Sequence, residues 1–311
     1  MAKILITESV HPIGPELLTA AGHTVVYADR DMDIIRREIV DADAVLVRII
    51  ELPGSLLATA KNLKIVSKHG VGYDNIDLDY CKSHGVAVTI TPNANSLSVA
   101  EHAFTLMLTL AKNIIPVSNE YRTIGFAAKN HAPGIEMTGK TLGLIGMGRI
   151  GKHVLHMCKD GLDMHAIVYD PYISEVPEGV EKVDDLSELL RRADVVTLHC
   201  LLTDETRKLI DRERLALMKP TALLINCARG PIVDEAALIE ALENGRLAGA
   251  GLDVTDPEPV APDSPLFKLP NVIVTPHYAP TTVESATRVS KIAAENINAV
   301  LAGKEPVGRI V

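Results

Sequence analysis

The first hundred residues alternate short apolar runs with segments of helical character. The apolar runs, which are rich in β-branched residues, predict strands at 3–7, 23–28, 44–49, 63–70 and 86–90. Segments such as 15–22 and 34–42 predict helices between them. Because the strand runs are continuously apolar rather than alternating, they indicate a parallel sheet covered on both faces by helices. Ligands of such a sheet bind at its carboxyl edge, where loops leave the strands.

A second series of apolar runs begins at Thr141. It predicts six parallel strands, at 141–146, 166–170, 194–200, 222–228, 249–254 and 271–277. Six parallel strands suit a dinucleotide-binding fold. Residues 99–115, between the two series, predict one long connecting helix. Residues 289–306 predict an amphipathic helix that ends at Gly303 and crosses back onto the first domain.

We therefore predict an α/β fold with two doubly wound parallel-sheet domains. The first domain comprises residues 1–97 together with 284–311, and the second comprises residues 98–283.

Composition narrows the classes of partner. Lys and Arg number 31 against 40 Asp and Glu, so the formal charge of −9 predicts no nucleic-acid partner. The cysteines lie far apart, at Cys81, Cys158, Cys200 and Cys227. Their spacing predicts neither a metal site nor a disulfide scaffold and favours the reducing cytoplasm. No apolar run reaches the ~18 residues of a membrane span, and the N-terminus lacks a signal-peptide pattern, so we expect no membrane association and no secretion.

A glycine motif follows the first strand of the second series. The motif G-x-G-x-x-G contains Gly146, Gly148, Arg149, Ile150 and Gly151, at a strand-to-helix junction. Such glycines allow a tight turn and a close approach of a dinucleotide pyrophosphate to the helix N-terminus. Asp170 ends the next strand, nineteen residues after Gly151, where a carboxylate binds ribose hydroxyls and repels a 2′-phosphate. The alternative is an ordinary glycine turn with a surface aspartate.

Polar residues gather where the later strands end. His199, Arg229 and His277 each lie at or just after a predicted strand, and Glu258 lies between two prolines in the loop 256–259. These strand ends share one edge of a parallel sheet. Arginine is suited to bidentate carboxylate binding, and histidine to proton transfer. Taken singly, Arg229 could instead cap carbonyls, Glu258 could be a solvated acid, and His277 could be structural.

Several segments resemble the signatures of a known family. Segments 226–230, 233–238, 252–254, 256–259 and 271–277 occur in the order seen in NAD-dependent D-2-hydroxyacid dehydrogenases, and 70–77 and 95–101 resemble further signatures of that family. The resemblance covers nearly the whole chain and is nearest to the phosphoglycerate dehydrogenase branch, in a short form without a regulatory domain. It implies a flavodoxin-like substrate domain, an NAD-binding Rossmann domain and a cleft that closes over a small anionic 2-hydroxy or 2-oxo acid. It also implies a homodimer built on the NAD-binding domain.

The resemblance implies roles for individual residues. Arg229 binds the substrate carboxylate, His277 is the acid/base, and Glu258 orients His277. The implied NAD contacts are Gly146, Gly148, Arg149, Ile150, Gly151, Asp170, His199, Thr206, Cys227, Arg229, Asp253 and His277. The implied substrate contacts are Arg48, Lys68, His69, Gly70, Val71, Gly72 and Arg229. Departures from the family pattern at Leu201, Tyr278 and Pro280, and the absence of Trp from 121–137, concern the substrate pocket, and the sequence leaves the substrate unnamed.

The chemistry of the candidate residues agrees with this resemblance. Hydride transfer from C2 of a hydroxy acid leaves a hydroxyl proton to be moved, and His277 beside Glu258 suits that task. Arg48 and Lys68 end strands of the first domain, which predicts a second anion contact and a doubly anionic substrate such as 3-phosphoglycerate. Pairing of these cations with Glu51 or another acid is the alternative. Glyoxylate or hydroxypyruvate reduction, formate or phosphite oxidation and an NAD-responsive interaction module are the other functions considered.

Overall fold

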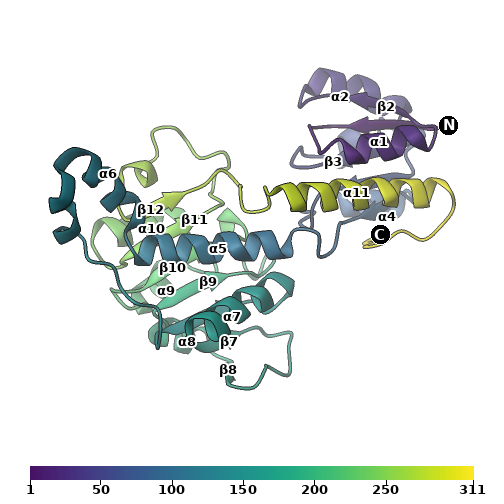
Figure 1. The fold of residues 1–311 in the computed structure, drawn as a ribbon. Coiled ribbons are helices and arrows are strands. Elements are labelled where there is room, and N and C mark those ends of the chain that lie inside the picture. The colour runs from purple at the N-terminus through teal and green to yellow at the C-terminus, as the bar shows by residue number, and fades with distance from the viewer. The chain divides into compact units, whose positions relative to one another are not determined.

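Buried aliphatic runs form the strands of two parallel sheets in the computed structural model, which describes residues 1–311 throughout. The chain divides into two units, one of Met1–Asn95 with Pro280–Val311 and the other of Ser96–Ala279. The ribbon of each unit, with its strands and helices labelled, is drawn in Figure 1.

The first unit is built on a five-stranded sheet with the order β2-β1-β3-β4-β5. Its strands are β1 (Lys3–Ile6), β2 (Thr24–Tyr27), β3 (Ala44–Val47), β4 (Ile65–Lys68) and β5 (Ala87–Thr89). Its helices are α1 (Ile13–Ala20), α2 (Met32–Glu38), the short η1 (Ile39–Asp41), α3 (Gly54–Leu57), α4 (Leu78–Ser83) and α11 (Val283–Leu301). All its strand pairs are parallel. This order confirms the predicted flavodoxin-like sheet.

The C-terminal helix α11 packs on α1 and on β4 of this unit. Gly14 permits the close approach, because a Cβ there would lie 2.6 Å from the Ser290 Oγ. The Ser67 hydroxyl on β4 donates a hydrogen bond to the Ala293 carbonyl over 3.0 Å. Ile297 on the same helix is fully buried. The helix that follows Ala279 in the chain is therefore part of the unit that begins at Met1.

The second unit contains a seven-stranded parallel sheet with the order β12-β11-β10-β9-β6-β7-β8. Its strands are β6 (Thr141–Ile145), β7 (His165–Tyr169), β8 (Val180–Lys182), β9 (Val195–Leu198), β10 (Leu223–Asn226), β11 (Gly249–Leu252) and β12 (Val272–Val274). Its helices are α5 (Ser96–Ala111), α6 (Ile114–Ile124), η2 (Gly125–Asn130), α7 (Arg149–Leu162), α8 (Leu186–Arg192), α9 (Arg212–Leu217), η3 (Gly230–Ile232), α10 (Glu235–Glu243) and η4 (Pro265–Lys268). Six of these strands have the Rossmann order, and β12 extends the sheet beyond β11. The predicted Rossmann fold is confirmed.

Two local predictions for this unit are wrong. The sequence predicts six strands, whereas the sheet has a seventh, β8. This edge strand is three residues long, with the exposed Glu181 at its centre, so it carries no apolar run. The helix expected over 99–115 is divided into α5 and α6, because Asn113 between them adopts a left-handed backbone with φ of 51°. Asparagine tolerates that conformation better than most residues.

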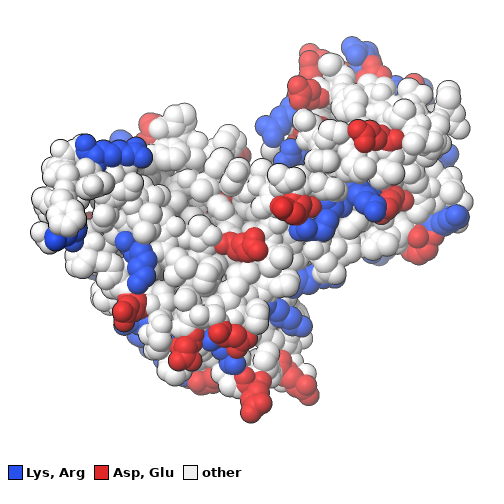
Figure 2. Space-filling model, in the orientation of Figure 1, with Lys and Arg blue, Asp and Glu red and all other residues white.

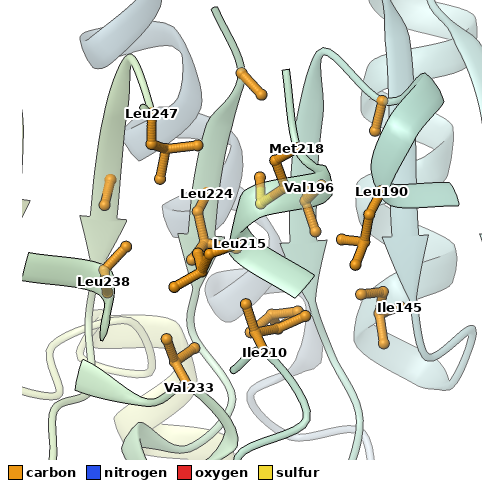
Figure 3. Close-up of a cluster of buried hydrophobic side chains, with 14 of the residues drawn as sticks. Ile145, Leu190, Val196, Ile210, Leu215, Met218, Leu224, Val233, Leu238 and Leu247 are labelled. Atoms are coloured by element: carbon orange, nitrogen blue, oxygen red, sulfur yellow. The ribbon is translucent and has the colours of Figure 1, made fainter. Parts of the chain in front are cut away.

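Hydrophobic cores cover both faces of the seven-stranded sheet. Helices α8, α9 and α10 cover one face, where Leu190, Leu215 and Leu238 belong to the same buried cluster as Leu224 of β10 (Figure 3). Helices α5 and α7 cover the other face, which receives Leu223 from the same strand. The alternation along β10 shows why its sequence is continuously apolar. Both faces are therefore closed, and the strand ends are left for binding.

Charged side chains of both signs are dispersed over the surface of the two units. Figure 2 shows Lys and Arg interspersed with Asp and Glu on the face that it draws. Many are paired locally: Arg192 lies 2.5 Å from Glu181 and 2.6 Å from Glu188. Exposed pairs of this kind contribute little to stability. Among the helices, none combines the length and the apolar composition needed to cross a membrane.

Candidate active site

The loop between β6 and α7 carries the glycine motif. Gly146 has a φ of +89°, and a Cβ there would lie 2.8 Å from the backbone nitrogen of Cys200, at the end of β9. A Cβ at Gly151 would lie 2.3 Å from the Gly146 carbonyl oxygen, so the helix packs directly on the turn. Gly148 has no heavy atom within 4 Å of its Cβ position. Exposed Arg149 and half-buried Ile150 begin α7. The open, glycine-lined start of this helix fits a dinucleotide pyrophosphate.

Asp170 lies at the end of β7, beside the glycine loop. Its Oδ2 accepts a hydrogen bond from the Met147 N–H over 2.9 Å, and its Oδ1 accepts one from the Tyr172 N–H over 3.0 Å. These two bonds fix the carboxylate against the loop. The Tyr172 hydroxyl in turn donates to Glu205 Oε2 over 3.1 Å. The structure thus holds Asp170 at the edge where a dinucleotide ribose binds in Rossmann folds.

His199 and Thr206 follow strand β9. The His199 N–H donates to the Ile145 carbonyl, and its Nε2 lies 2.8 Å from the Thr197 Oγ1. Burial lowers the pKa of His199 to about 3, so the ring is neutral at physiological pH. Its buried Nδ1 has no hydrogen-bond partner within the protein, which fits a place beside a bound polar ligand. The Thr206 hydroxyl donates to the Leu201 carbonyl over 2.6 Å and so closes the turn after the strand.

Arg229 is held at the end of β10 by a tight loop. The Asn226 side chain donates from Nδ2 to the Arg229 carbonyl over 2.9 Å and accepts the Ala228 N–H over 3.0 Å. The Arg229 Nη1 donates to the Ala228 carbonyl over 2.8 Å. At Gly230, a Cβ would lie only 1.9 Å from the Thr255 carbonyl oxygen, in the loop that follows β11. Direct backbone packing therefore fixes the loop that carries Arg229, and the bond to the Ala228 carbonyl orients its guanidinium.

Cys227 precedes this arginine and is buried. Burial and the neighbouring Asp253 raise the pKa of the thiol well above its ordinary value. The side chain is therefore an uncharged part of the wall at this edge of the sheet.

Glu258 and His277 form a close pair at the same edge. The His277 Nδ1 lies 2.6 Å from the Glu258 Oε1, and the two side chains are 34% and 39% exposed. Glu258 lies in a loop with cis peptide bonds at Asp256–Pro257 and Glu258–Pro259. Since Nδ1 faces the carboxylate, Nε2 is the ring nitrogen that can exchange a proton with a ligand.

Asp253 holds the turn that carries His277. This carboxylate is 1% exposed. Its Oδ1 accepts hydrogen bonds from the Thr275 hydroxyl and the Tyr278 N–H, over 2.5 and 2.7 Å, and its Oδ2 accepts the Ala279 N–H over 2.9 Å. His277 itself has a left-handed φ of 53°, and its N–H donates to the Asp253 carbonyl over 2.8 Å. A buried carboxylate thus supports a strained backbone next to the imidazole.

His102 on α5 adds to the same cluster. Its Nε2 lies 3.0 Å from the Thr275 Oγ1 and 3.5 Å from the Asp253 Oδ1. The connecting helix therefore contacts the turn at the end of β12.

The predicted substrate residues of the first unit follow β3 and β4. The Lys68 ammonium is buried and donates hydrogen bonds to the Asn75 Oδ1, over 2.6 Å, and to the Arg48 carbonyl. Burial, together with the charges of Arg48 and Lys68, lowers the pKa of His69 to about 3. The structure therefore gathers two cations and a neutral imidazole at one edge of this sheet.

The predicted glycine-rich segment lies directly after His69. Gly70 has a φ of +147°, which favours glycine, and its carbonyl accepts the Thr91 N–H and hydroxyl over 2.9 and 3.1 Å. Val71 and Gly72 continue this loop and are half-buried.

Glu8 is a further residue at this edge of the sheet, and the sequence does not predict it. This residue follows β1, is 2% exposed and accepts the Arg48 N–H over 2.7 Å. The only signal for it in the sequence is an acidic residue directly after a buried strand.

The sequence of this chain is similar to those of known proteins. Residues 104–279 match the family model described as D-isomer specific 2-hydroxyacid dehydrogenase, NAD binding domain. The chain is 43% identical over 308 residues to D-3-phosphoglycerate dehydrogenase of Methanocaldococcus jannaschii, a match that covers 98% of this chain and 58% of that enzyme. It is 38% identical over 319 residues to glyoxylate reductase of Thermofilum pendens, covering 98% of this chain and 93% of the reductase.

Solved structures of the same family are similar to this chain in fold. The structure of D-lactate dehydrogenase from Aquifex aeolicus, complexed with NAD and lactic acid, matches with a TM-score of 0.88 at 32% identity. That match covers 96% of each chain. By contrast, the present chain spans little more than half, 55% to 58%, of the length of three phosphoglycerate dehydrogenases that it matches.

Proposed function

Because the chain belongs to the D-isomer specific 2-hydroxyacid dehydrogenase family, we propose that it interconverts a small D-2-hydroxy acid and its 2-oxo acid with NAD. The observation that carries this proposal is the 2.6 Å contact between His277 and Glu258 at the sheet edge that also holds Arg229 and the glycine loop. An acid/base, an anion anchor and a dinucleotide site are the three parts that this reaction needs.

Each part has a chemical task in the proposed reaction. The glycine loop would hold the cofactor, which would supply the hydride as NADH in the reducing direction and accept it as NAD in the oxidising direction. In the reducing direction, His277 donates the Nε2 proton to the 2-oxo oxygen, and in the oxidising direction it accepts the hydroxyl proton. Glu258 at Nδ1 fixes the ring orientation and balances the charge of the protonated ring. Arg229 binds the substrate carboxylate, for which the planar guanidinium is suited.

The remaining cofactor contacts are proposed from their place at the carboxyl edge of the second sheet. Gly146, Gly148, Arg149, Ile150 and Gly151 would hold the pyrophosphate, and Asp170 would bind the adenosine ribose. Further contacts are proposed for His199, Thr206, Cys227 and Asp253. The substrate contacts His69, Gly70, Val71 and Gly72 are proposed for the first unit, in the domain assigned to residues 1–97 and 284–311.

A preference for NAD over NADP is the first expected result. Asp170 would face the 2′-phosphate of NADP, and like charges at close range repel. We expect the wild type to favour NADH over NADPH in kcat/KM, and Asp170→Asn to narrow that ratio by about tenfold. Steady-state kinetics with both cofactors measure the ratio. The control is Asp163→Asn at the end of α7, and equal or better kcat/KM of the wild type with NADPH would contradict the assignment.

The substrate proposed first is a doubly anionic 2-oxo acid such as 3-phosphohydroxypyruvate, the oxidised form of 3-phosphoglycerate. Arg48 and Lys68 at one sheet edge, and 43% identity to a phosphoglycerate dehydrogenase, support it. Reduction of glyoxylate or hydroxypyruvate is the second candidate. It is favoured by the match to a glyoxylate reductase over 93% of that enzyme's length.

A substrate screen tests the function and separates these candidates. Purified protein with NADH is assayed against glyoxylate, hydroxypyruvate, 3-phosphohydroxypyruvate, pyruvate and sulfopyruvate by loss of NADH absorbance. We expect turnover of at least one of them. A kcat/KM at least ten times higher for 3-phosphohydroxypyruvate than for hydroxypyruvate supports the doubly anionic substrate, and the reverse order supports the second candidate. Inactivity with all five acids would refute the proposed function.

A homodimer through the NAD-binding unit is proposed from exposed apolar side chains on α6 and η2. Helix α6 buries none of its residues, and its apolar side chains are exposed: Ile114 is 55% exposed and Tyr121 is 60% exposed. Phe126 on η2 is 73% exposed. These two helices lie at the margin of the second unit (Figure 1). Covering them with a second copy would remove these apolar side chains from water.

The dimer is tested by Phe126→Asp. A charge in an apolar interface is costly, so we expect light scattering after gel filtration to change from twice the chain mass to the chain mass. Val307→Asp, at an exposed valine of the first unit, is the control and should leave the wild-type mass unchanged. A monomeric wild type would contradict the proposal.

A cytoplasmic location is also proposed. All four cysteines are free, and burial raises the pKa of Cys158 to about 12 and that of Cys81 to about 11. Free, unreactive thiols are typical of proteins in a reducing compartment.

A further inference from the structure

The loop that follows β3 is held through its backbone by side chains from outside the loop. The N–H groups of Arg48 and Ile49 donate to the Glu8 carboxylate over 2.7 and 3.0 Å. The Arg48 carbonyl accepts a hydrogen bond from the Lys68 ammonium, and the Ile50 carbonyl accepts one from the Asn75 Nδ2 over 2.7 Å. The donors and the acceptors of residues 48–50 are thus bound from opposite sides.

The three side chains that hold this loop are buried, and two of them, Lys68 and Asn75, are bonded to each other. Glu8, Lys68 and Asn75 are 2%, 7% and 7% exposed. The Lys68 ammonium also donates to the Asn75 Oδ1 over 2.6 Å, and Glu8 accepts the Thr7 hydroxyl over 2.9 Å. Burying two charged groups costs free energy that their bonds must offset. In an exposed loop, water could form hydrogen bonds with the same backbone groups. The need to satisfy these groups therefore does not by itself explain why buried side chains bind them.

The loop leaves Ile49 exposed and Arg48 partly exposed while its backbone is fixed. Ile49 is 51% exposed. The half-buried Arg48 directs Nη1 to the Ser9 carbonyl over 3.0 Å, which sets the course of its side chain along the end of β1. A rigid backbone beneath the half-buried Arg48 reduces the conformational entropy that would be lost when a ligand binds to this side chain.

We propose that Glu8, Lys68 and Asn75 are positioning residues that fix residues 48–50 so that Arg48 binds the second anionic group of the substrate. Lys68 then acts through Arg48, and not as a direct anion contact of the kind the sequence predicts. This inference rests on the proposed function and names the residues that select a doubly charged 2-oxo acid.

Kinetics in two backgrounds test this inference. Glu8→Gln and Lys68→Met are made singly and together with Arg48→Ala, and KM is measured for 3-phosphohydroxypyruvate and for the singly charged hydroxypyruvate. Residues that act through one arginine are not additive with its removal. We expect each single variant to raise KM for the phosphorylated acid about tenfold, with kcat and the KM for NADH within about twofold of wild type. In the Arg48→Ala background the same changes should raise KM no further.

Two outcomes would overturn the inference. A further tenfold rise in KM on adding Lys68→Met to Arg48→Ala would make Lys68 a direct anion contact. Unchanged KM in both single variants would show that the loop needs no fixing. Glu51→Gln is the matched control for Glu8→Gln, because it removes the same charge from an exposed neighbouring side chain. It should leave the KM for 3-phosphohydroxypyruvate unchanged.

Hydrogen exchange provides a readout that does not depend on turnover. The amides of Arg48 and Ile49 should exchange at least ten times faster in Glu8→Gln than in wild type, while amides of β1 change less. Equal exchange in the two proteins would refute the positioning role even in an active enzyme. Inactivity of the wild type with every acid would instead refute the proposed function, and the exchange result would still show whether Glu8 fixes the loop.

Discussion

Replacing His277 with alanine is expected to lower kcat by ~10²–10⁴-fold, the contribution of general acid–base catalysis. The Nδ1 of this ring lies 2.6 Å from Glu258, so Nε2 is the nitrogen that exchanges the proton with substrate. Without it, water must supply the proton. Because the glycine loop is untouched, the Kd for NADH should change little. Steady-state kinetics with the best 2-oxo acid and a fluorescence titration with NADH measure the two quantities.

Two further variants sharpen this prediction. Glu258→Gln keeps a hydrogen-bonding partner for Nδ1 but removes its charge, so the loss in kcat should be smaller than in His277→Ala. His165→Ala removes an exposed imidazole at the opposite end of the strands, at the start of β7, and should leave kcat near the wild-type value. Near-normal turnover by His277→Ala with intact NADH binding would show that another group transfers the proton.

The sheets could be predicted because burial on both faces leaves a direct trace in the sequence. A parallel strand covered by helices must be apolar at successive positions, as Leu223 and Leu224 show by entering opposite cores. Strand β8 lies at an edge and lacks this trace. The break at Asn113 depends on a single backbone conformation, which the apolar pattern of the surrounding helices does not reveal.

Topology also explains which site residues the sequence could place. Residues after parallel strands meet at one edge, so Arg229, His277 and the glycine motif could be assigned to one region before any contact was known. The hydrogen-bond partners of Glu8 and Asp253 could not be assigned in this way. Glu8 bonds backbone groups 40 and 41 residues away, and Asp253 bonds groups 22 to 26 residues away. Such contacts depend on how loops from different strands meet, which no local pattern records.

The substitution Gly230→Ala should disable the site while adding a single methyl group. The new Cβ would lie 1.9 Å from the Thr255 carbonyl oxygen and 2.2 Å from its carbon. Both atoms belong to the backbone, so no side chain can turn aside, and the loops must separate by about 1 Å. Overpacking of this kind costs about 3 kcal/mol in the free energy of unfolding. A shift of that size in the loops that carry Arg229 and Glu258 should lower kcat/KM by ~10²-fold.

Gly161→Ala is the matched control for this prediction. Gly161 lies within α7 and has no heavy atom within 4 Å of its Cβ position, so the same methyl group should stabilise the fold by about 0.5–1 kcal/mol. Denaturant unfolding and kcat/KM are measured for both variants. The opposite signs of the two stability changes would show that the close approach at residue 230, and not the added methyl group itself, is responsible. Wild-type stability and kcat/KM in Gly230→Ala would mean that the loops after β10 and β11 are free to separate, and that their direct packing does not hold Arg229 and Glu258 in place.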